Sequence, residues 1–243
     1  MIDFKFIINK KYLFLHAFRH KLKISPEWVH LHNKVWKIDK DVYNFLIGHP
    51  EAIISNRSLK QLSTKADKII VNILHTKEFK KTHQETECYK KWISKQWSRN
   101  KININSILKR ILKIDIPKIK FKVFLTHPRL TNGHYLGNYK ICWGHPEEWR
   151  NYSVVYLIHE TFHEILKNNS RLMHAIIELA ADNQLRIKLN KKGKYFDIKG
   201  HKELKKIEKI LYPYWIKYLK DKEKNIFEFF EEIKKIKIIQ KIK

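Results

Sequence analysis

Segment 154–166, VVYLIHETFHEIL, constrains the fold of this chain more than any other stretch. It reads as a largely apolar, buried helix on which His159 and His163 stand four residues apart. At 3.6 residues per turn these two positions share one face, so both imidazoles can reach the same metal ion. Glu160 follows the first histidine and can reach a water molecule bound to that ion. The sequence therefore predicts a metal-binding helix, and the rest of the chain is interpreted around it.

The next predicted helix supplies candidates for a further ligand. The pattern HExxH is typical of zinc peptidases, and a catalytic zinc ion needs three protein ligands and one exchangeable water. Metzincins place a third histidine six residues after the second, but position 169 is Asn here, which excludes that class. His174, Glu178 and Asp182 follow at intervals of four residues and so occupy one helical face. Glu178 stands among apolar neighbours, where a carboxylate without a partner is costly.

These residues resemble the gluzincin clan of zinc metallopeptidases, in which a glutamate on a second helix completes the HExxH site. The resemblance runs from a predicted strand near residue 119 to the end of the second helix near residue 189. It implies that His159, His163 and Glu178 bind Zn²⁺ and that Glu160 is the general base. It also implies that Asp182 orients a ligating histidine. The resemblance does not assign the clan's transition-state donor, for which the candidates are Arg186, Tyr195 and His201.

The function that the resemblance implies is that of a zinc metallopeptidase, a hydrolase acting on peptide or protein substrates. We expect His174 to lie on the helix face or to support the site rather than to bind the metal. Segment 139–143 is a candidate edge strand, along which a peptide could add as a further strand. A further possibility is that the segment from 201 onward covers the site and keeps the protein latent.

The net charge of +27 leaves a second function open. A strongly basic chain can bind nucleic acid or another polyanion, and basic and aromatic residues are interleaved in the first hundred positions. The alternative is therefore a nucleic-acid-associated or regulatory protein whose zinc site is structural or vestigial. However, lysine is spread through every segment together with isoleucine and asparagine, which is also the outcome of compositional drift in an AT-rich genome.

Cysteine content and hydropathy indicate the compartment. Cys88 and Cys142 are too few for a disulfide framework. No apolar run approaches the roughly 20 residues that a membrane-spanning helix needs. A cytoplasmic protein is the expectation, and the sequence does not specify an oligomeric state.

The predicted fold class is α+β and mainly helical, with a zincin-like core and helical additions at both ends. In this core a small antiparallel or mixed sheet lies beside the HExxH helix. We expect three regions, namely a helical N-terminal region (1–115), a zincin-like catalytic core (116–200) and a C-terminal helical segment (201–243). Strands are predicted at 2–8, 119–123 and 134–143. Apolar spacing predicts helices at 12–22, 28–36, 41–47, 59–74, 85–97, 170–189, 202–219 and 225–239.

Overall fold

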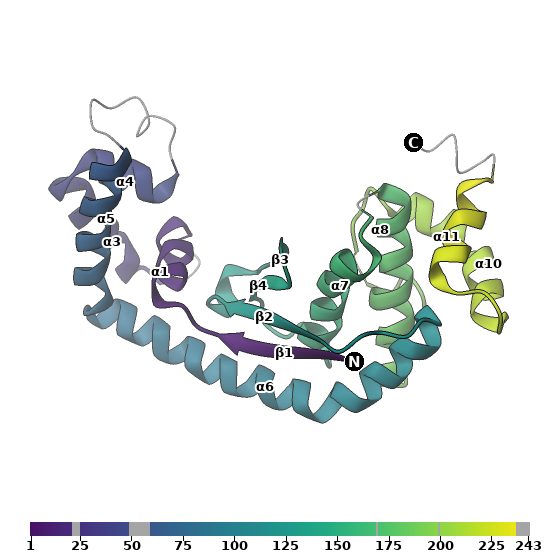
Figure 1. Ribbon diagram of the computed structural model, residues 1–243. Helices are drawn as coiled ribbons and strands as arrows, with labels where there is room; N and C mark the ends of the chain where they lie inside the picture. Colours follow the sequence, from purple (N-terminus) through teal and green to yellow (C-terminus); the bar gives the residue numbers. More distant parts are fainter. Residues whose placement is uncertain (21–24, 49–58, 169, 199, 237–243) are drawn as a thin grey trace.

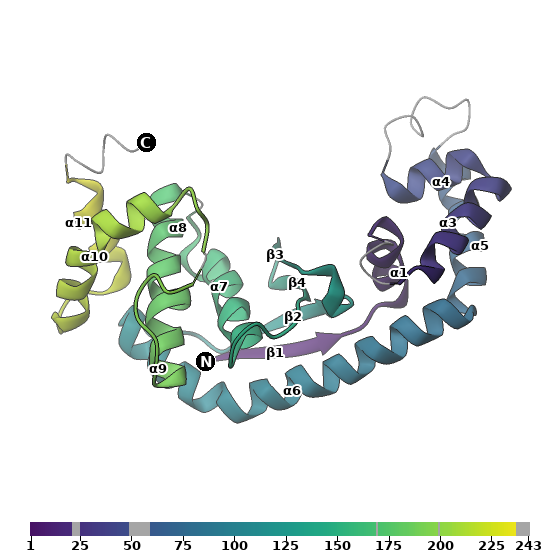
Figure 2. The same cartoon turned by 180° about the vertical axis from the view of Figure 1, so that it is seen from behind.

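The fold is organised along one long helix. The computed structural model describes residues 1–20, 25–48, 59–168, 170–198 and 200–236. Helix α6 (Lys77–Leu112) runs along the length of the molecule, and the sheet lies over its middle (Figure 1). N-terminal helices stand over one end of α6 and the C-terminal half of the chain stands over the other (Figures 1 and 2). The predicted class, mainly helical α+β, is confirmed.

A four-stranded mixed sheet lies beside the HExxH helix, as predicted. Its strands are β1 (Ile2–Ile7), β2 (Ile119–Leu125), β3 (Asn132–Gly137) and β4 (Lys140–Gly144), in the order β1-β2-β4-β3. β1 and β4 both run parallel to β2, and β3 runs antiparallel to β4. Along β2, Phe121 and Val123 are buried whereas Lys120 and Lys122 are exposed, because successive side chains point to opposite faces.

The strand predicted at 134–143 is a hairpin instead. The chain reverses through Gly137, Asn138 and Tyr139, whose φ angles are all positive at 82°, 50° and 57°. Three consecutive residues in this conformation turn the chain back, whereas the glycine alone was interpreted as an interruption within one strand. As a result β4 lies between β2 and β3, so the prediction of an edge strand at 139–143 is wrong. The edges are β1 and β3.

Helix α6 is much longer than the helix predicted at 85–97 and contains 36 residues. The predicted range begins only after the polar stretch near residue 81. This stretch stays helical because Thr82 faces inward, donating to the carbonyl of Glu78 (3.0 Å) and accepting from the indole of Trp28 (3.1 Å). The helix ends where Lys113 adopts the left-handed conformation (φ 53°). Its inward side is defined by Phe79, Thr82, Thr86, Tyr89, Ile93, Trp97, Ile104, Ile107, Leu108, Ile111 and Leu112.

The N-terminal helices confirm most of the predicted ranges. They are α1 (Lys10–Arg19), α3 (Glu27–Ile38), α4 (Lys40–Ile47) and α5 (Leu59–Leu74). Helix α1 ends before the predicted residue 22, and residues 21–24 lie outside the described part of the chain. A short 3-10 turn, Pro128–Leu130, follows β2 and adds Leu130 to the hydrophobic cluster that these helices enclose.

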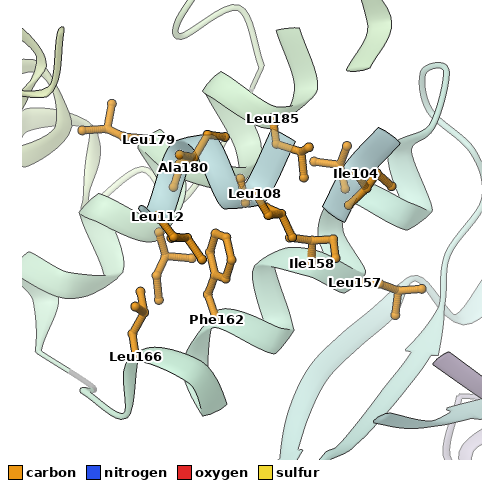
Figure 3. Packing of buried hydrophobic residues seen from close by; sticks show 14 of the residues in the cluster. Ile104, Leu108, Leu112, Leu157, Ile158, Phe162, Leu166, Leu179, Ala180 and Leu185 are labelled. Carbon is orange, nitrogen blue, oxygen red and sulfur yellow. The ribbon is translucent and has the colours of Figure 1, made fainter. Parts of the chain in front are cut away.

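The C-terminal half packs around the HExxH helix, α7 (Tyr152–Leu166). Figure 3 shows Phe162 and Leu166 of α7 against Leu108 and Leu112 of α6, with Ala180 close by. Pro213 lies inside α10. The end predicted for the last helix, at residue 239, falls outside the described residues. The remaining helices are α8 (Arg171–Ile177), α9 (Arg186–Asn190), α10 (Lys205–Lys220) and α11 (Ile226–Lys234).

Two hydrophobic clusters divide the buried residues. One joins α1, α3, α4 and α5 with the start of α6. The other joins β1, the rest of α6, the sheet, α7 and the C-terminal helices. The expected division into three regions stays a prediction, and the second cluster crosses both of its boundaries. Trp215 of α10 and Phe229 of α11 belong to this core, so both helices pack on the body of the protein. Whether the segment from 201 onward keeps the protein latent stays a prediction. Within the described ranges no helix is both long and apolar enough to cross a membrane.

Candidate metal centre

Helix α7 holds the first histidine of the HExxH motif inside the protein. The Glu147 carboxylate accepts hydrogen bonds from the first two backbone N–H groups of the helix, at 3.1 and 3.2 Å, and so caps its N-terminus. His159 is 3% exposed, whereas Glu160 and His163 are half-buried. Burial raises the pKa of Glu160 above the usual value of a glutamate. The helix therefore presents one buried imidazole, one accessible imidazole and a carboxylate with increased proton affinity.

The second helix carries its two carboxylates on a π-helical segment, η3 (Glu178–Leu185), between α8 and α9. The continuous α-helix predicted for 170–189 is wrong in this respect. The side-chain amide of Asn183 donates to the backbone carbonyl of Glu178 (3.0 Å), which helps to accommodate the widened turn. Segments of this kind occur frequently at functional sites. Glu178 and Asp182 are 0% and 1% exposed, so neither is a solvated surface carboxylate.

Asp182 reaches across to the HExxH helix. Its two carboxylate oxygens lie 3.2 and 3.1 Å from Nδ1 of His159. A carboxylate in this position fixes the tautomer and orientation of a metal-binding imidazole. The Nδ1–H of His159 then donates to Asp182, which leaves Nε2 free to bind a metal ion. A contact between Asp182 and a histidine of the motif is what the resemblance to gluzincins implies.

Four side chains from three parts of the chain converge at this nitrogen. One ligand atom from each of His159, His174, Glu178 and His201 lies within 4.8 Å of the others. Nε2 of His174 is 3.3 Å from Nε2 of His159, and Nε2 of His201 is 3.7 Å from a Glu178 oxygen. Such separations suit a single ion, since a tetrahedral zinc with Zn–N bonds of about 2.0–2.1 Å places its ligand atoms roughly 3.4 Å apart. These side chains could hold a metal ion.

His163 stands beside this group rather than within it. Its ring centroid is 5.5 Å from that of His159 and 5.0 Å from that of His174. Two imidazoles on one tetrahedral zinc have centroids roughly 5 Å apart, so the spacing is compatible with His163 as a ligand. Burial, followed by the nearby His159, lowers the pKa of His163 to about 4 and that of His174 to about 3. Both imidazoles are therefore neutral near pH 7, which is the form that binds metals.

The structure separates the three candidates for a transition-state donor. The guanidinium of Arg186 donates to the backbone carbonyls of Asp182 (2.8 Å) and Lys194 (2.6 Å). The hydroxyl of Tyr195 is held by Gln184 and by the indole of Trp215. His201, whose side chain is 49% exposed, is the one that joins the cluster.

Sequence reasoning missed how closely His174 and His201 approach the site. His174 was expected to lie on the helix face or to support the site rather than to bind the metal, although its position four residues before Glu178 was a usable signal. His201 follows a glycine-containing loop and belongs to no periodic pattern, so its position depends on how that loop folds back. The sequence named His201 as a candidate donor but gave no signal that it would join the possible metal ligands.

Several buried carboxylates lie at the site, and their negative charge needs to be balanced by a cation. Glu178, Asp182 and Glu208 are all at most 1% exposed, and the ammonium of Lys205 lies 3.5 Å from Glu208. One oxygen of Glu178 and one of Glu208 have no hydrogen-bond partner among the described residues. Burial is the main cause that raises the pKa of all three carboxyl groups.

A divalent ion satisfies this need, because a buried carboxylate oxygen without a donor is costly. Imidazole nitrogen together with carboxylate oxygen is a donor set that zinc accepts. The residues present therefore fit a zinc ion.

Gly200 packs directly on the candidate ligand Glu178. A Cβ at this position would contact a carboxylate oxygen of Glu178 and stand 3.2 Å from its Cδ and 3.2 Å from Nζ of Lys205. Gly200→Ala is therefore expected to displace the carboxylate and weaken zinc affinity by roughly 10–100-fold, the range found when the surroundings of a ligand are disturbed. Competition with a chromophoric chelator measures this affinity. Lys202→Ala, an exposed change in the same loop, is the control; equal affinities for both variants would contradict the expectation.

Comparison with known proteins adds no further assignment. A scan against protein-family models finds no match, and neither do searches of curated proteins and of solved structures. The functional argument therefore depends on the residues and geometry described above.

Proposed function

We propose that this protein is a zinc-dependent metallopeptidase in which His159, His163 and Glu178 bind the ion. The observation that supports the proposal is the contact between α7 and η3. There the imidazole of His159 is oriented by Asp182, and its free nitrogen belongs to the same group as the Glu178 carboxylate. When bound, zinc supplies a Lewis acid that polarises a carbonyl oxygen and lowers the pKa of water to about 7.

Within this proposal the protein's own side chains have distinct roles. Glu160 accepts the proton of the attacking water and passes it to the leaving amine. Its raised pKa supports this role, because a general base works best with a pKa near the working pH. His174 and His201 are the N–H donors within reach of a carbonyl oxygen at the site. They replace Arg186 and Tyr195 as the candidate donors.

The position of the substrate follows from the corrected sheet order. Helix α7 contacts both β3 and β4, and of these two strands only β3 is an edge. An extended peptide could add to β3 through main-chain hydrogen bonds. Asn132–Gly137 therefore replaces 139–143 as the proposed substrate-binding strand.

A second candidate function is favoured by one observation. The four side chains within 4.8 Å of one another, which include His201 but not His163, would complete a tetrahedral shell without water. Structural zinc sites are closed in this way, whereas catalytic sites keep an open position. In that case the zinc would stabilise the fold of a regulatory or nucleic-acid-associated protein.

Two single variants separate these functions. For a peptidase, His163→Ala loses both zinc and the cleavage of a mixed peptide library followed by mass spectrometry, whereas His201→Ala keeps stoichiometric zinc. For a closed structural site, His201→Ala loses zinc and His163→Ala keeps it, and the wild-type protein does not cleave the library. A wild-type protein that folds fully and binds no zinc would refute both functions.

A further inference from the structure

Three lysines form one row across three neighbouring strands, and none of them belongs to the candidate metal site. In the register of the sheet, Lys5 of β1 pairs with Lys122 of β2, and Lys122 pairs with Lys140 of β4. Paired residues on adjacent strands project from the same face, and neighbouring strands are about 4.8 Å apart. We call Lys5, Lys122 and Lys140 the lysine row. Lys120, two positions before Lys122 on β2, projects from the same face and extends the row along that strand.

This part of the sheet face is open. All three residues of the lysine row, and Lys120, are exposed. The other end of the same face is covered by α1, where the ring of Tyr12 lies 5.9 Å from that of Phe124. The face is therefore half covered by a helix and half presented to solvent, and the lysines occupy the uncovered half.

The lysine row is not neutralised by the protein. Within the described ranges no carboxylate forms an ion pair with any of its ammonium groups. Asp3 stands opposite Lys120 in the register, but its carboxylate is engaged by Lys101 at 2.9 Å and by the indole of Trp97 at 3.0 Å. Like charges directly opposite each other destabilise a sheet, and lysine is depleted in strands. The paired lysines therefore lower the stability of the sheet, and the fold alone does not explain their presence.

We propose that the lysine row binds the phosphate backbone of a nucleic acid. The ligand must carry several negative charges a few ångströms apart, as successive phosphates do. The contacts are electrostatic and independent of sequence, because lysine ammonium groups act as point charges. The net charge of +27 assists by attracting a polyanion from a distance.

An anionic membrane is the less suitable partner. Interfacial binding combines basic residues with exposed aromatic or apolar side chains that enter the lipid. Among the described residues, the exposed tryptophans and phenylalanine, Trp36, Trp92 and Phe227, lie on helices, in α3, α6 and α11. The exposed apolar side chains in or beside the sheet are Met1, Leu136 and Tyr139. Met1 adjoins β1 and the other two lie at the β3–β4 hairpin, so they stand at different edges of the sheet and do not form one apolar patch beside the lysine row.

The test compares two triple variants of the full chain that remove the same charge. Lys5→Gln/Lys122→Gln/Lys140→Gln removes the row, and Lys91→Gln/Lys95→Gln/Arg99→Gln removes three exposed cations from α6. A labelled single-stranded DNA of mixed sequence is titrated with each protein over a range of salt concentrations. For single strands, a plot of the logarithm of the binding constant against the logarithm of the salt concentration has a slope of about −0.7 per phosphate contact. Loss of three contacts should therefore reduce the magnitude of this slope by roughly 2. Near 0.1 M salt it should bind roughly 10–100-fold more weakly, whereas the α6 variant should resemble the wild type.

The stability of the row variant adds a second readout. Because it removes opposed like charges, its thermal midpoint should equal or exceed that of the wild type, so a binding defect does not reflect unfolding. Equal losses for both triple variants would show that only total charge matters and would overturn the proposal. Absence of DNA binding at low salt would also overturn it, as would row-dependent binding to phosphatidylserine vesicles without binding to DNA. The experiment does not depend on the metal site.

Discussion

Glu160→Gln is expected to leave zinc binding unchanged and to lower the rate of peptide hydrolysis by roughly 10²–10⁴-fold, the range that a positioned general base contributes. The amide has nearly the same shape as the carboxylate but cannot accept a proton from water. Glu160 is not a member of the group that converges on His159, and Asp182 continues to orient that histidine. The metal content, measured by atomic absorption, should therefore remain stoichiometric while turnover falls.

Glu164→Gln provides a matched control for this change. Glu164 lies on the same helix, one turn further along, and is half-buried like Glu160. The substitution removes the same charge from α7 but not the proton acceptor next to His159. Both variants should bind zinc, and only Glu160→Gln should lose turnover. Full activity of Glu160→Gln would remove it from the proposed mechanism.

Removal of the metal is expected to lower the thermal midpoint of unfolding by roughly 8–16 °C. An ion present at a thousand times its dissociation constant adds about 4 kcal/mol to the stability of the protein that binds it. For a chain of this size each kcal/mol corresponds to roughly 2–4 °C. The physical origin is the set of buried carboxylates, Glu178, Asp182 and Glu208. Glu178 and Glu208 each have one oxygen without a hydrogen-bond partner in the part of the chain that the structure describes. Scanning calorimetry with and without a chelator measures the shift.

Two histidine variants show whether this shift arises at the proposed site. His159→Ala removes the imidazole common to both candidate ligand sets, so its midpoint should be the same with chelator and with zinc. His30→Ala changes an exposed histidine on α3 and should retain the whole shift. A wild-type protein that melts at one temperature in both conditions would contradict zinc binding in the folded state.

The helices and strands around the site were predictable where apolar residues recur at regular spacing along the sequence. Apolar residues at helical spacing indicated α7, and the alternation of Phe121 and Val123 with lysines indicated β2. The hairpin between β3 and β4 was missed because the turn signal of Gly137 and Asn138 was not recognised, and the positive φ angle of the third turn residue, Tyr139, has no sequence signal. Helix α6 was underestimated because Thr82, a polar residue, lies on its buried side.

The candidate site was predictable where helical spacing and the resemblance to gluzincins applied. Spacing placed Glu178 and Asp182 on one helical face, the resemblance linked them to His159 on the other helix, and the structure brings all three together. His201 was named as a candidate donor, but its place among the possible metal ligands was not predicted, because it depends on a loop that folds over Glu178 through Gly200. The π-helical segment was also not foreseen, since no local pattern distinguishes it from an α-helix and the Asn183 contact to a backbone carbonyl is made only after folding.

The parallel pairing of β1 with β2 sets an order of events during synthesis. Ile2 pairs with Ile119, so at roughly 5–20 residues per second the first strand waits roughly 6–23 seconds for its partner to leave the ribosome. The hydrophobic cluster of α1, α3, α4 and α5 draws all but one of its fully buried members from residues 13–79. Those helices can therefore associate while β1 is still unpaired. We therefore expect the nascent chain to form its N-terminal helical cluster first and to assemble the sheet and the candidate metal centre last.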